Sequence, residues 1–152
     1  MTIAFIGHAR LASSEGIKEK VKEEIRKNIT EAAVSCYFGG YGAFDTICAR
    51  ACMELKAEYN GLEVLYVAPY ISASEGRKIK DLEMQGLCDG SIYPPIEKTP
   101  PKFAILKRNE WMMASADLVI AFVNRNYGGA FQALQVANRK KKKIINICNF
   151  IG

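Results

Sequence analysis

The sequence has 152 residues, of which 49% are hydrophobic and 24% charged, and a formal net charge of +5. These values lie near the globular average and predict one domain, residues 1–152, with its own hydrophobic core. The longest apolar runs, Ile3–Ile6 and Leu118–Val123, have the length of strands. They are too short to cross a membrane, so a membrane partner is not expected.

The first apolar run begins within two residues of Met1, with no basic segment and long apolar stretch before it. No signal peptide is therefore predicted, and we expect a cytoplasmic protein. The cysteines are odd in number and form no C-x-x-C pair, which argues against a disulfide framework. His8 is the only histidine that could complete a metal site, so we expect no metal or other cofactor, and reduced, buried cysteines. The cysteines are Cys36, Cys48, Cys52, Cys88 and Cys148.

The first half of the chain alternates apolar runs of strand length with segments of helical periodicity. The apolar stripe of the first helix repeats every four residues, which keeps one face turned inward. Ser13 and Ser14 precede this helix, and we expect them to cap its N-terminus. In chain order the predicted elements are a strand at 2–6, a helix with its stripe at 17–29, a strand at 33–38, a helix over about 44–55 and a strand at 62–68.

Residues 70–101 are the irregular part of the chain. Ser72 and Glu75 have the spacing of a capping box, which predicts a short helix over about 73–84. Glycine and proline pairs then interrupt the chain repeatedly, and a loop of this length is either functional or disordered. The alternation returns with a helix at 102–115, a strand at 116–123, a helix over about 130–140 and a strand at 143–148.

This alternation predicts an α/β fold with a mainly parallel, five-stranded sheet. Strands separated by helices cannot pair antiparallel through short turns, and near-continuous apolar runs suit strands that are buried on both faces. Helices should therefore cover both sides of the sheet. With right-handed crossovers, the domain is doubly wound and Rossmann-like.

In an open parallel sheet, a ligand lies beyond the carboxyl ends of the strands. Turns 39–42 and 128–129 are rich in glycine, which permits positive φ and brings N–H groups close to an anion. The helix after each turn adds its positive end, so the two turns predict a phosphate site without a Walker motif. The expected ligand-binding residues are Gly7, His8, Arg10, Gly39, Gly40, Tyr41, Gly42, Asp45, Arg108, Asn109, Asn124, Tyr127, Gly128 and Gly129.

Some of these side chains have specific expected roles. Arg10 and Arg108 are candidates for phosphate binding, because a guanidinium presents a planar fork of donors; surface ion pairs are the alternative. Tyr41 and Tyr127 lie one in each glycine turn and are candidates for stacking on a base. His8 either contacts the ligand or hydrogen-bonds a neighbouring loop.

Three further features concern partners and local structure. Bulky apolar residues at 111–113 exceed what one helix face can bury, so we expect a homo-oligomer, a dimer with helix 102–115 in its interface. The basic run Arg139–Lys143 is expected to stabilise a helix C-terminus, with a nucleic-acid contact as the alternative. We expect Asp117 to cap or pair locally, and Asp45 to stabilise a helix dipole or take part in chemistry.

Four motifs taken together resemble the SLOG superfamily, and more closely its YpsA/YoqJ-like branch in Firmicutes and their phages. The resemblance implies a Rossmann-like fold that binds nucleotides or nucleotide-derived molecules. Members include the DNA-processing protein DprA, the LOG phosphoribohydrolases and sensor domains of antiviral and NAD-linked signalling systems. The motifs are Phe5-Ile6-Gly7-His8-x-Arg10, Gly39-Gly40-x-Gly42-x-x-Asp45, Arg108-Asn109-x-Trp111-Met112 and Gly128-Gly129-Ala130.

One departure from the family bears on catalysis. The LOG-type enzymes carry a catalytic glutamate in a G-T-x-x-E arrangement, where this sequence has Ala130 in place of threonine and Ala133 in place of glutamate. Alanine cannot attack a sugar or stabilise its cationic centre. We therefore expect the chain to sense, carry or sequester a nucleotide-derived ligand, such as an ADP-ribose-type or cyclic nucleotide, without turnover. The alternatives are a nucleoside-monophosphate N-glycosidase that uses Asp45, and DprA-like binding of single-stranded DNA.

Overall fold

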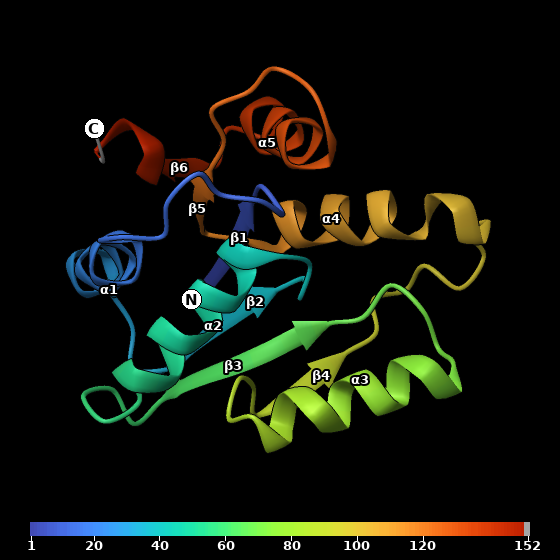
Figure 1. The fold of residues 1–152 in the computed structure, drawn as a ribbon, viewed down its shortest axis with the longest axis horizontal. Helices are drawn as coiled ribbons and strands as arrows, with labels where there is room; N and C mark the ends of the chain where they lie inside the picture. The colour runs from blue at the N-terminus through green and yellow to red at the C-terminus, as the bar shows by residue number, and fades with distance from the viewer. Residues whose placement is uncertain (151–152) are drawn as a thin grey trace.

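The computed structural model describes residues 1–150, in which six strands form one sheet. Their order across the sheet is β4-β3-β2-β1-β5-β6, and all neighbouring strands run parallel (Figure 1). The predicted α/β, doubly wound class is confirmed. The strands are β1 (Thr2–Gly7), β2 (Val34–Phe38), β3 (Leu62–Val67), β4 (Gly90–Ile92), β5 (Leu118–Phe122) and β6 (Lys143–Asn146).

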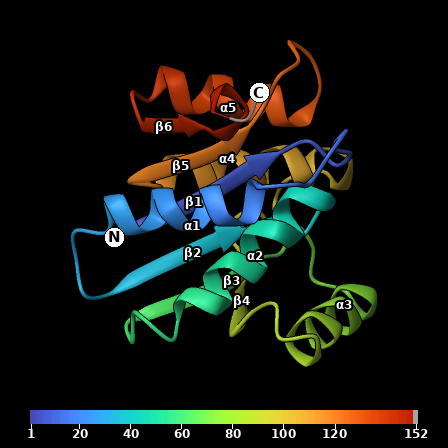
Figure 2. The same cartoon turned by 60° about the vertical axis from the view of Figure 1, so that its left-hand side comes forward.

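Helices cover both faces of this sheet, as the sequence predicts. Figure 2 shows α1 and α2 together on one side of the sheet and α4 on the other, where α4 packs beside α5. Helix α3 lies beside β4 at the margin of the sheet. The helices are α1 (Ile17–Asn28), α2 (Ala43–Leu55), α3 (Ala73–Met84), α4 (Ala104–Ser115) and α5 (Gly129–Arg139), with short 3-10 helices at Pro101–Phe103 and Ile147–Asn149.

The order of the strands reverses at β1, which lies between β2 and β5. The chain after β1 passes to the face that α1 covers, and the chain after β5 passes to the opposite face, which α5 covers. The two connections therefore diverge at the carboxyl edge of the sheet, and such a switch point is where open α/β sheets bind ligands.

Apolar periodicity accounts for how the helices attach. Ile17, Val21 and Ile25 are fully buried against the sheet, while Ile29 is partly buried at the end of α1. Each fully buried side chain of this size stabilises the fold by about 1.5–3 kcal/mol. Across residues 1–150, no helix has the length and apolarity that crossing a membrane requires.

The prediction of five strands missed β4, which lies within the segment 70–101 that was expected to be irregular. Strand β4 pairs with β3, with Leu65 opposite Gly90 and Val67 opposite Ile92. It has only three residues, and Pro94 follows closely, so it leaves no periodic signal in the sequence. Its place in the sheet comes from tertiary pairing rather than from local preference.

The predicted cap of α1 was wrong, whereas that of α3 is confirmed. Helix α1 begins after Gly16, which has a φ of 78° and provides no side-chain cap; Ser13 instead accepts a hydrogen bond from the N–H of Glu15 at 3.2 Å. A left-handed glycine turns the chain into this helix, so the serines fall one turn too early. At α3, the hydroxyl of Ser72 accepts a hydrogen bond from the N–H of Glu75 at 3.1 Å.

The bulky residues of α4 are not left exposed. Met112 and Met113 are fully buried between the sheet and α5, and Trp111 is half-buried and stacks on Tyr37 with ring centroids 5.5 Å apart. The expectation that one face of this helix cannot bury these residues is therefore wrong, because α4 and α5 pack side by side and α5 covers part of the apolar surface of α4. Self-association remains a prediction without support from this helix.

Two smaller expectations are confirmed. The carboxylate of Asp117 pairs with the adjacent strand β1, where it accepts a hydrogen bond from the N–H of Thr2 at 2.8 Å. The cysteines are free, and all except the half-buried Cys148 are buried. Burial raises the pKa of the Cys48 and Cys52 thiols, which keeps them protonated in the core.

Candidate functional site

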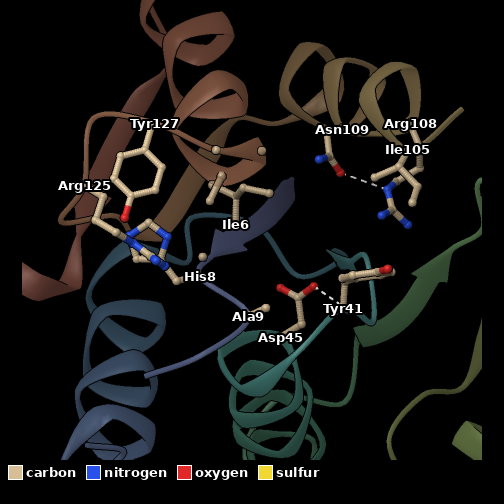
Figure 3. A pocket seen from close by; sticks show the side chains of 14 residues that line it. Ile6, His8, Ala9, Tyr41, Asp45, Ile105, Arg108, Asn109, Arg125 and Tyr127 are labelled. Atoms are coloured by element: carbon tan, nitrogen blue, oxygen red, sulfur yellow. Dashed lines mark hydrogen bonds between the residues drawn. The ribbon is translucent and has the colours of Figure 1, made fainter. Parts of the chain in front are cut away.

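A cavity of about 310 Å³ opens at the carboxyl edge of the sheet, at the point where β1 and β5 diverge. Its walls are formed by the end of β1, the loops that follow β1, β2 and β5, the first turns of α2 and α5, and the first half of α4 (Figure 3). This is the place that the fold predicts for a ligand. The cavity brings together most of the expected residues, namely Gly7, His8, Tyr41, Asp45, Arg108, Asn109, Tyr127, Gly128 and Gly129.

The turn from β2 to α2 rests directly on the end of β1. Gly42 has a φ of 97° and a ψ of −168°, a conformation essentially restricted to glycine. A Cβ at this position would lie 2.4 Å from the Cα of Ala9, so only a glycine permits the approach. The N–H of Ala43 then donates to the carbonyl of Ala9 at 2.9 Å, which fixes the two loops relative to each other.

Asp45, in the first turn of α2, points into the cavity between Tyr41 and His8 (Figure 3). Its side chain is 4% exposed, and its Oδ2 accepts a hydrogen bond from the N–H of Tyr41 at 3.0 Å. Its Oδ1 is buried and has no partner among residues 1–150. Burial raises the pKa of Asp45 to about 6, against the opposing effects of the N–H of Tyr41 and of the charges of Arg108 and Lys78. A ligand can therefore meet an ionised carboxylate here at neutral pH.

The turn from β5 to α5 leaves a helix end open. Gly128 has a φ of 92° and a ψ of 175°, and no side chain caps α5. Among residues 1–150, the N–H groups of Gly129, Ala130 and Phe131 have no acceptor, and the first turn carries no acidic residue. These groups and the helix dipole favour an anion at this point.

Arg125 precedes this helix end and supplies the exposed cation of the cavity. Its guanidinium carbon lies 5.5 Å from the centroid of the Tyr127 ring, which is 64% exposed. Arginine on an aromatic face keeps its donors free at its rim. The arrangement places a cation and an exposed aromatic ring next to the open end of α5.

His8 joins the ends of β1 and β5. Its Nε2 accepts a hydrogen bond from the backbone N–H of Asn124 at 3.0 Å, and the backbone N–H of His8 donates to the carbonyl of Phe122 at 3.3 Å. Burial, followed by the nearby charge of Arg125, lowers the pKa of His8, so the imidazole is neutral at pH 7. The loop hydrogen bond that was one of two expectations for His8 is present, and the ring also lines the cavity.

Arg108 and Asn109 lie on α4 at the opposite wall. The Arg108 side chain is 1% exposed, and its Nη1 donates to the carbonyl of Val67 at 2.7 Å and to that of Gly39 at 3.1 Å. Its Nε donates to the Oδ1 of Asn109 at 2.9 Å. A guanidinium with these bonds fastens α4 to two strand ends and has few donors left for a phosphate.

The cavity wall lacks some of the residues that the sequence predicts and contains others that it does not. The sequence prediction missed Arg125, although this residue lies in the glycine-rich exit of β5, between Asn124 and Tyr127, which are both expected ligand-binding residues. The other wall residues that were not expected are apolar, so their side chains give no chemical signal in the sequence. Arg10 is exposed and lies outside the wall. The expected residues outside the wall are Arg10, Gly39, Gly40, Gly42 and Asn124; the additional wall residues are Ile6, Ala9, Ile105, Arg125 and Ala130.

Two further features limit the chemistry of the site. Ala133, which stands where the LOG-type enzymes carry glutamate, is 1% exposed and packs in the core. Among residues 1–150, no group of three or more histidine, cysteine, aspartate or glutamate side chains is arranged to hold a metal ion. The groups that face a ligand are therefore a carboxylate, a neutral imidazole, a cation and backbone N–H donors.

The fold and the position of the cavity define a Rossmann-like α/β protein. No family model and no curated protein matches the sequence. Among the solved structures that it resembles is DNA processing protein A from Helicobacter pylori, at 19% identity and a TM-score of 0.60, covering 95% of this chain and 63% of that one. Another is TM1055, a structural genomics target, at 11% identity and a TM-score of 0.55, covering 94% and 71%. The chain thus spans less than two thirds of DNA processing protein A, and these likenesses show the fold alone.

Proposed function

We propose that the cavity binds a nucleotide or a nucleotide-derived molecule, with a phosphate at the N-terminus of α5, and that the chain senses, carries or sequesters it. One observation carries the proposal: a single cavity joins the open helix end at Gly128–Gly129, the cation of Arg125 and the unpartnered Oδ1 of Asp45. A ligand that carries an anion at one end and a hydrogen-bond donor at the other would satisfy these groups. A sugar phosphate has both.

The shape of the cavity supports the remaining part of such a ligand. Tyr41 and Tyr127 are 60% and 64% exposed at the rim. A cation lies over one face of each ring, Lys78 over Tyr41 and Arg125 over Tyr127, so a base would stack on the opposite face. A charge-assisted hydrogen bond from Arg125 is about twice as strong as a neutral one, and the helix end adds about 0.3–1 kcal/mol. Membership of the SLOG superfamily, which the motifs suggest, is part of this proposal.

The test has two steps. Native mass spectrometry of freshly purified protein looks for a retained mass of nucleotide size. Calorimetric titration then measures the affinities of nucleoside monophosphates, cyclic nucleotides and ADP-ribose for the wild type and for Gly128→Val. We expect the variant to lose binding, because a branched side chain would occupy the phosphate position. Equal affinity in both proteins, for a ligand that binds tightly, would place the site elsewhere.

A second candidate, hydrolysis of the N-glycosidic bond of a nucleoside monophosphate, is favoured by one observation. Asp45, whose Oδ1 has no partner, lines the cavity, where its carboxylate would stabilise the positive charge that develops at the anomeric carbon. Water would add to that carbon, and the base would leave with a proton. The core position of Ala133 argues against this reaction, so we expect no free base on chromatography. Release of base that Asp45→Asn abolishes would establish the enzyme.

Single-stranded DNA is the ligand that the comparison with DNA processing protein A raises, since that protein is described as binding it. In this chain the basic run Arg139–Lys143 follows the C-terminus of α5, whereas the cavity lies at its N-terminus. The run is therefore not part of the candidate site. An affinity for oligonucleotides that falls steeply with salt would favour DNA over the small ligand.

A further inference from the structure

Asp45 carries the only buried side-chain nitrogen or oxygen in residues 1–150 that lacks a hydrogen-bond partner, its Oδ1. A buried acceptor without a donor costs about 1–3 kcal/mol, and more when it is charged. Folded proteins satisfy nearly all such atoms, and an exception calls for an explanation. Asp45 is one of the residues that line the candidate cavity, so its carboxylate lies beside the space that a bound molecule would fill (Figure 3).

The neighbouring cations do not satisfy this oxygen. The charge of Arg108 lowers the pKa of Asp45, but its Nη1 donates to the carbonyls of Gly39 and Val67. In the described chain, Arg108 forms no ion pair within 4.0 Å. Lys78 lies over the rings of Tyr66 and Tyr41, with its Nζ 5.0 and 5.7 Å from their centroids. The N–H of Gly39 also lowers the pKa of Asp45, but it forms no hydrogen bond of normal geometry with Oδ1. A donor from a bound molecule would satisfy this oxygen.

We infer that Asp45 accepts a hydrogen bond from one ribose hydroxyl of the ligand, so that the cavity selects ribonucleotides over deoxyribonucleotides. This inference rests on the proposed function and names the class of its ligand. It assigns Asp45 as a residue that determines specificity.

The geometry favours a hydroxyl over the other donors of a nucleotide. The Oδ2 of Asp45 already accepts from the N–H of Tyr41, so Oδ1 is the one oxygen of this carboxylate without a donor. A single hydroxyl matches one unpartnered oxygen better than the paired donors of a guanine edge do. A phosphate carries no donor at neutral pH and is repelled by an ionised carboxylate. If the phosphate lies at Gly128–Gly129 and the base at the tyrosines of the rim, the sugar comes between them, within reach of Asp45.

The experiment compares ligands that differ by one hydroxyl. Calorimetry at pH 7.5, above the pKa of Asp45, measures the dissociation constants of the four ribonucleoside 5′-monophosphates and ADP-ribose. The same is done for the 2′-deoxy and 3′-deoxy counterparts of the monophosphates. We expect removal of one of the two hydroxyls to weaken binding about 10- to 100-fold, the usual effect of losing a hydrogen bond to a charged group.

Two variants assign this preference to Asp45. Asp45→Asn keeps an acceptor for the N–H of Tyr41 but loses the charge, and we expect the ratio of deoxy to ribo dissociation constants to fall below about threefold. Asp117→Asn is the matched control, because Asp117 also accepts a backbone N–H but lies at the opposite edge of the sheet. Its ratio should equal that of the wild type.

The outcomes separate this inference from the function on which it rests. Equal affinity of the wild type for ribo and deoxy ligands, or a preference for deoxy ligands, would overturn the inference while nucleotide binding stands. A preference that survives in Asp45→Asn would also overturn it. If none of these ligands binds the wild type, the proposed function fails, and the inference fails with it.

Discussion

The guanidinium of Arg108 donates a hydrogen bond to the carbonyl of Gly39 at 3.1 Å, across 69 residues of sequence. A Cβ at position 39 would lie 3.0 Å from the carbon of that guanidinium, so the backbone and the side chain fit closely. The same Nη1 reaches the carbonyl of Val67 at 2.7 Å. Arg108 thus joins α4 to the ends of β2 and β3 and forms one wall of the cavity.

Because of these bonds, Arg108→Ala should reduce stability rather than affinity alone. The carbonyls of Gly39 and Val67 would lose a buried donor, at about 1–3 kcal/mol each, and a void would remain. We expect the free energy of unfolding in urea to fall by about 2–5 kcal/mol. Arg10→Ala serves as the control, since Arg10 is exposed and should change stability by no more than about 0.5 kcal/mol. A stable Arg108→Ala protein would contradict this role.

Arg125→Ala should have the opposite effect. Arg125 is exposed beside Tyr127 and supports no other part of the fold through a side-chain hydrogen bond in residues 1–150. Removing it should leave the urea midpoint unchanged and weaken binding of a phosphate-bearing ligand about 10-fold or more, as expected for a charged hydrogen bond. Calorimetry at two salt concentrations checks this result. Unchanged affinity at low salt would remove Arg125 from the site.

Asp45→Asn should stabilise the ligand-free protein above pH 6. Folding raises the pKa of Asp45 from 3.8 to about 6, so the folded state binds the proton more tightly than the unfolded state does. The stability of the wild type therefore falls as pH rises from about 4 to about 6, and the whole loss applies above that range. We expect the variant to be more stable by about 1–3 kcal/mol at pH 8 and equally stable near pH 4. Urea unfolding at both pH values measures the difference, and parallel pH profiles would contradict the prediction.

Alanine at Gly42 and at Gly128 should have unequal effects. Both glycines adopt a conformation that costs other residues about 1–3 kcal/mol, but only at Gly42 would the new Cβ collide with Ala9. We expect Gly128→Ala to fold with that modest loss and Gly42→Ala to lose clearly more or fail to fold. In Gly76→Ala, within α3, the methyl group meets open space, and stability should rise by about 0.5–1 kcal/mol. Similar losses at both turns would show that the contact with Ala9 is not limiting.

The sequence was sufficient for the layers of the fold because its signals are local. Apolar runs of strand length and helical stripes such as that of Ile17, Val21 and Ile25 persist in the structure, and Ser72 caps α3 as its spacing predicts. Strand β4 was missed because three residues between turns carry no period. The edge of the sheet at which the cavity opens was also predictable, since glycine clusters at strand exits are visible in the sequence.

The roles of individual side chains were less accessible, because they depend on which groups meet in space. The chemistry of Arg108 predicts a phosphate ligand, but the sequence does not show that carbonyls after β2 and at the end of β3 take the donors of its Nη1. Asp45 is important because one of its oxygens has no partner after folding, and no local pattern encodes that. Arg10 and Arg125 are both exposed arginines that follow a strand, but only Arg125 lies in the cavity wall. That difference depends on the order of the strands in the sheet.

The two outer strands of the sheet influence how copies of this protein can meet. Strand β4 has three residues before the chain reaches Pro94 and Pro95, and β6 begins with exposed Lys143 and ends in a 3-10 helix. Short margins with proline or lysine offer few free backbone groups to a strand from another molecule. The sheet is therefore protected against continuing from one copy into the next, which guards against aggregation at high concentration. Any specific self-association of this chain should accordingly use helix surfaces rather than strand margins.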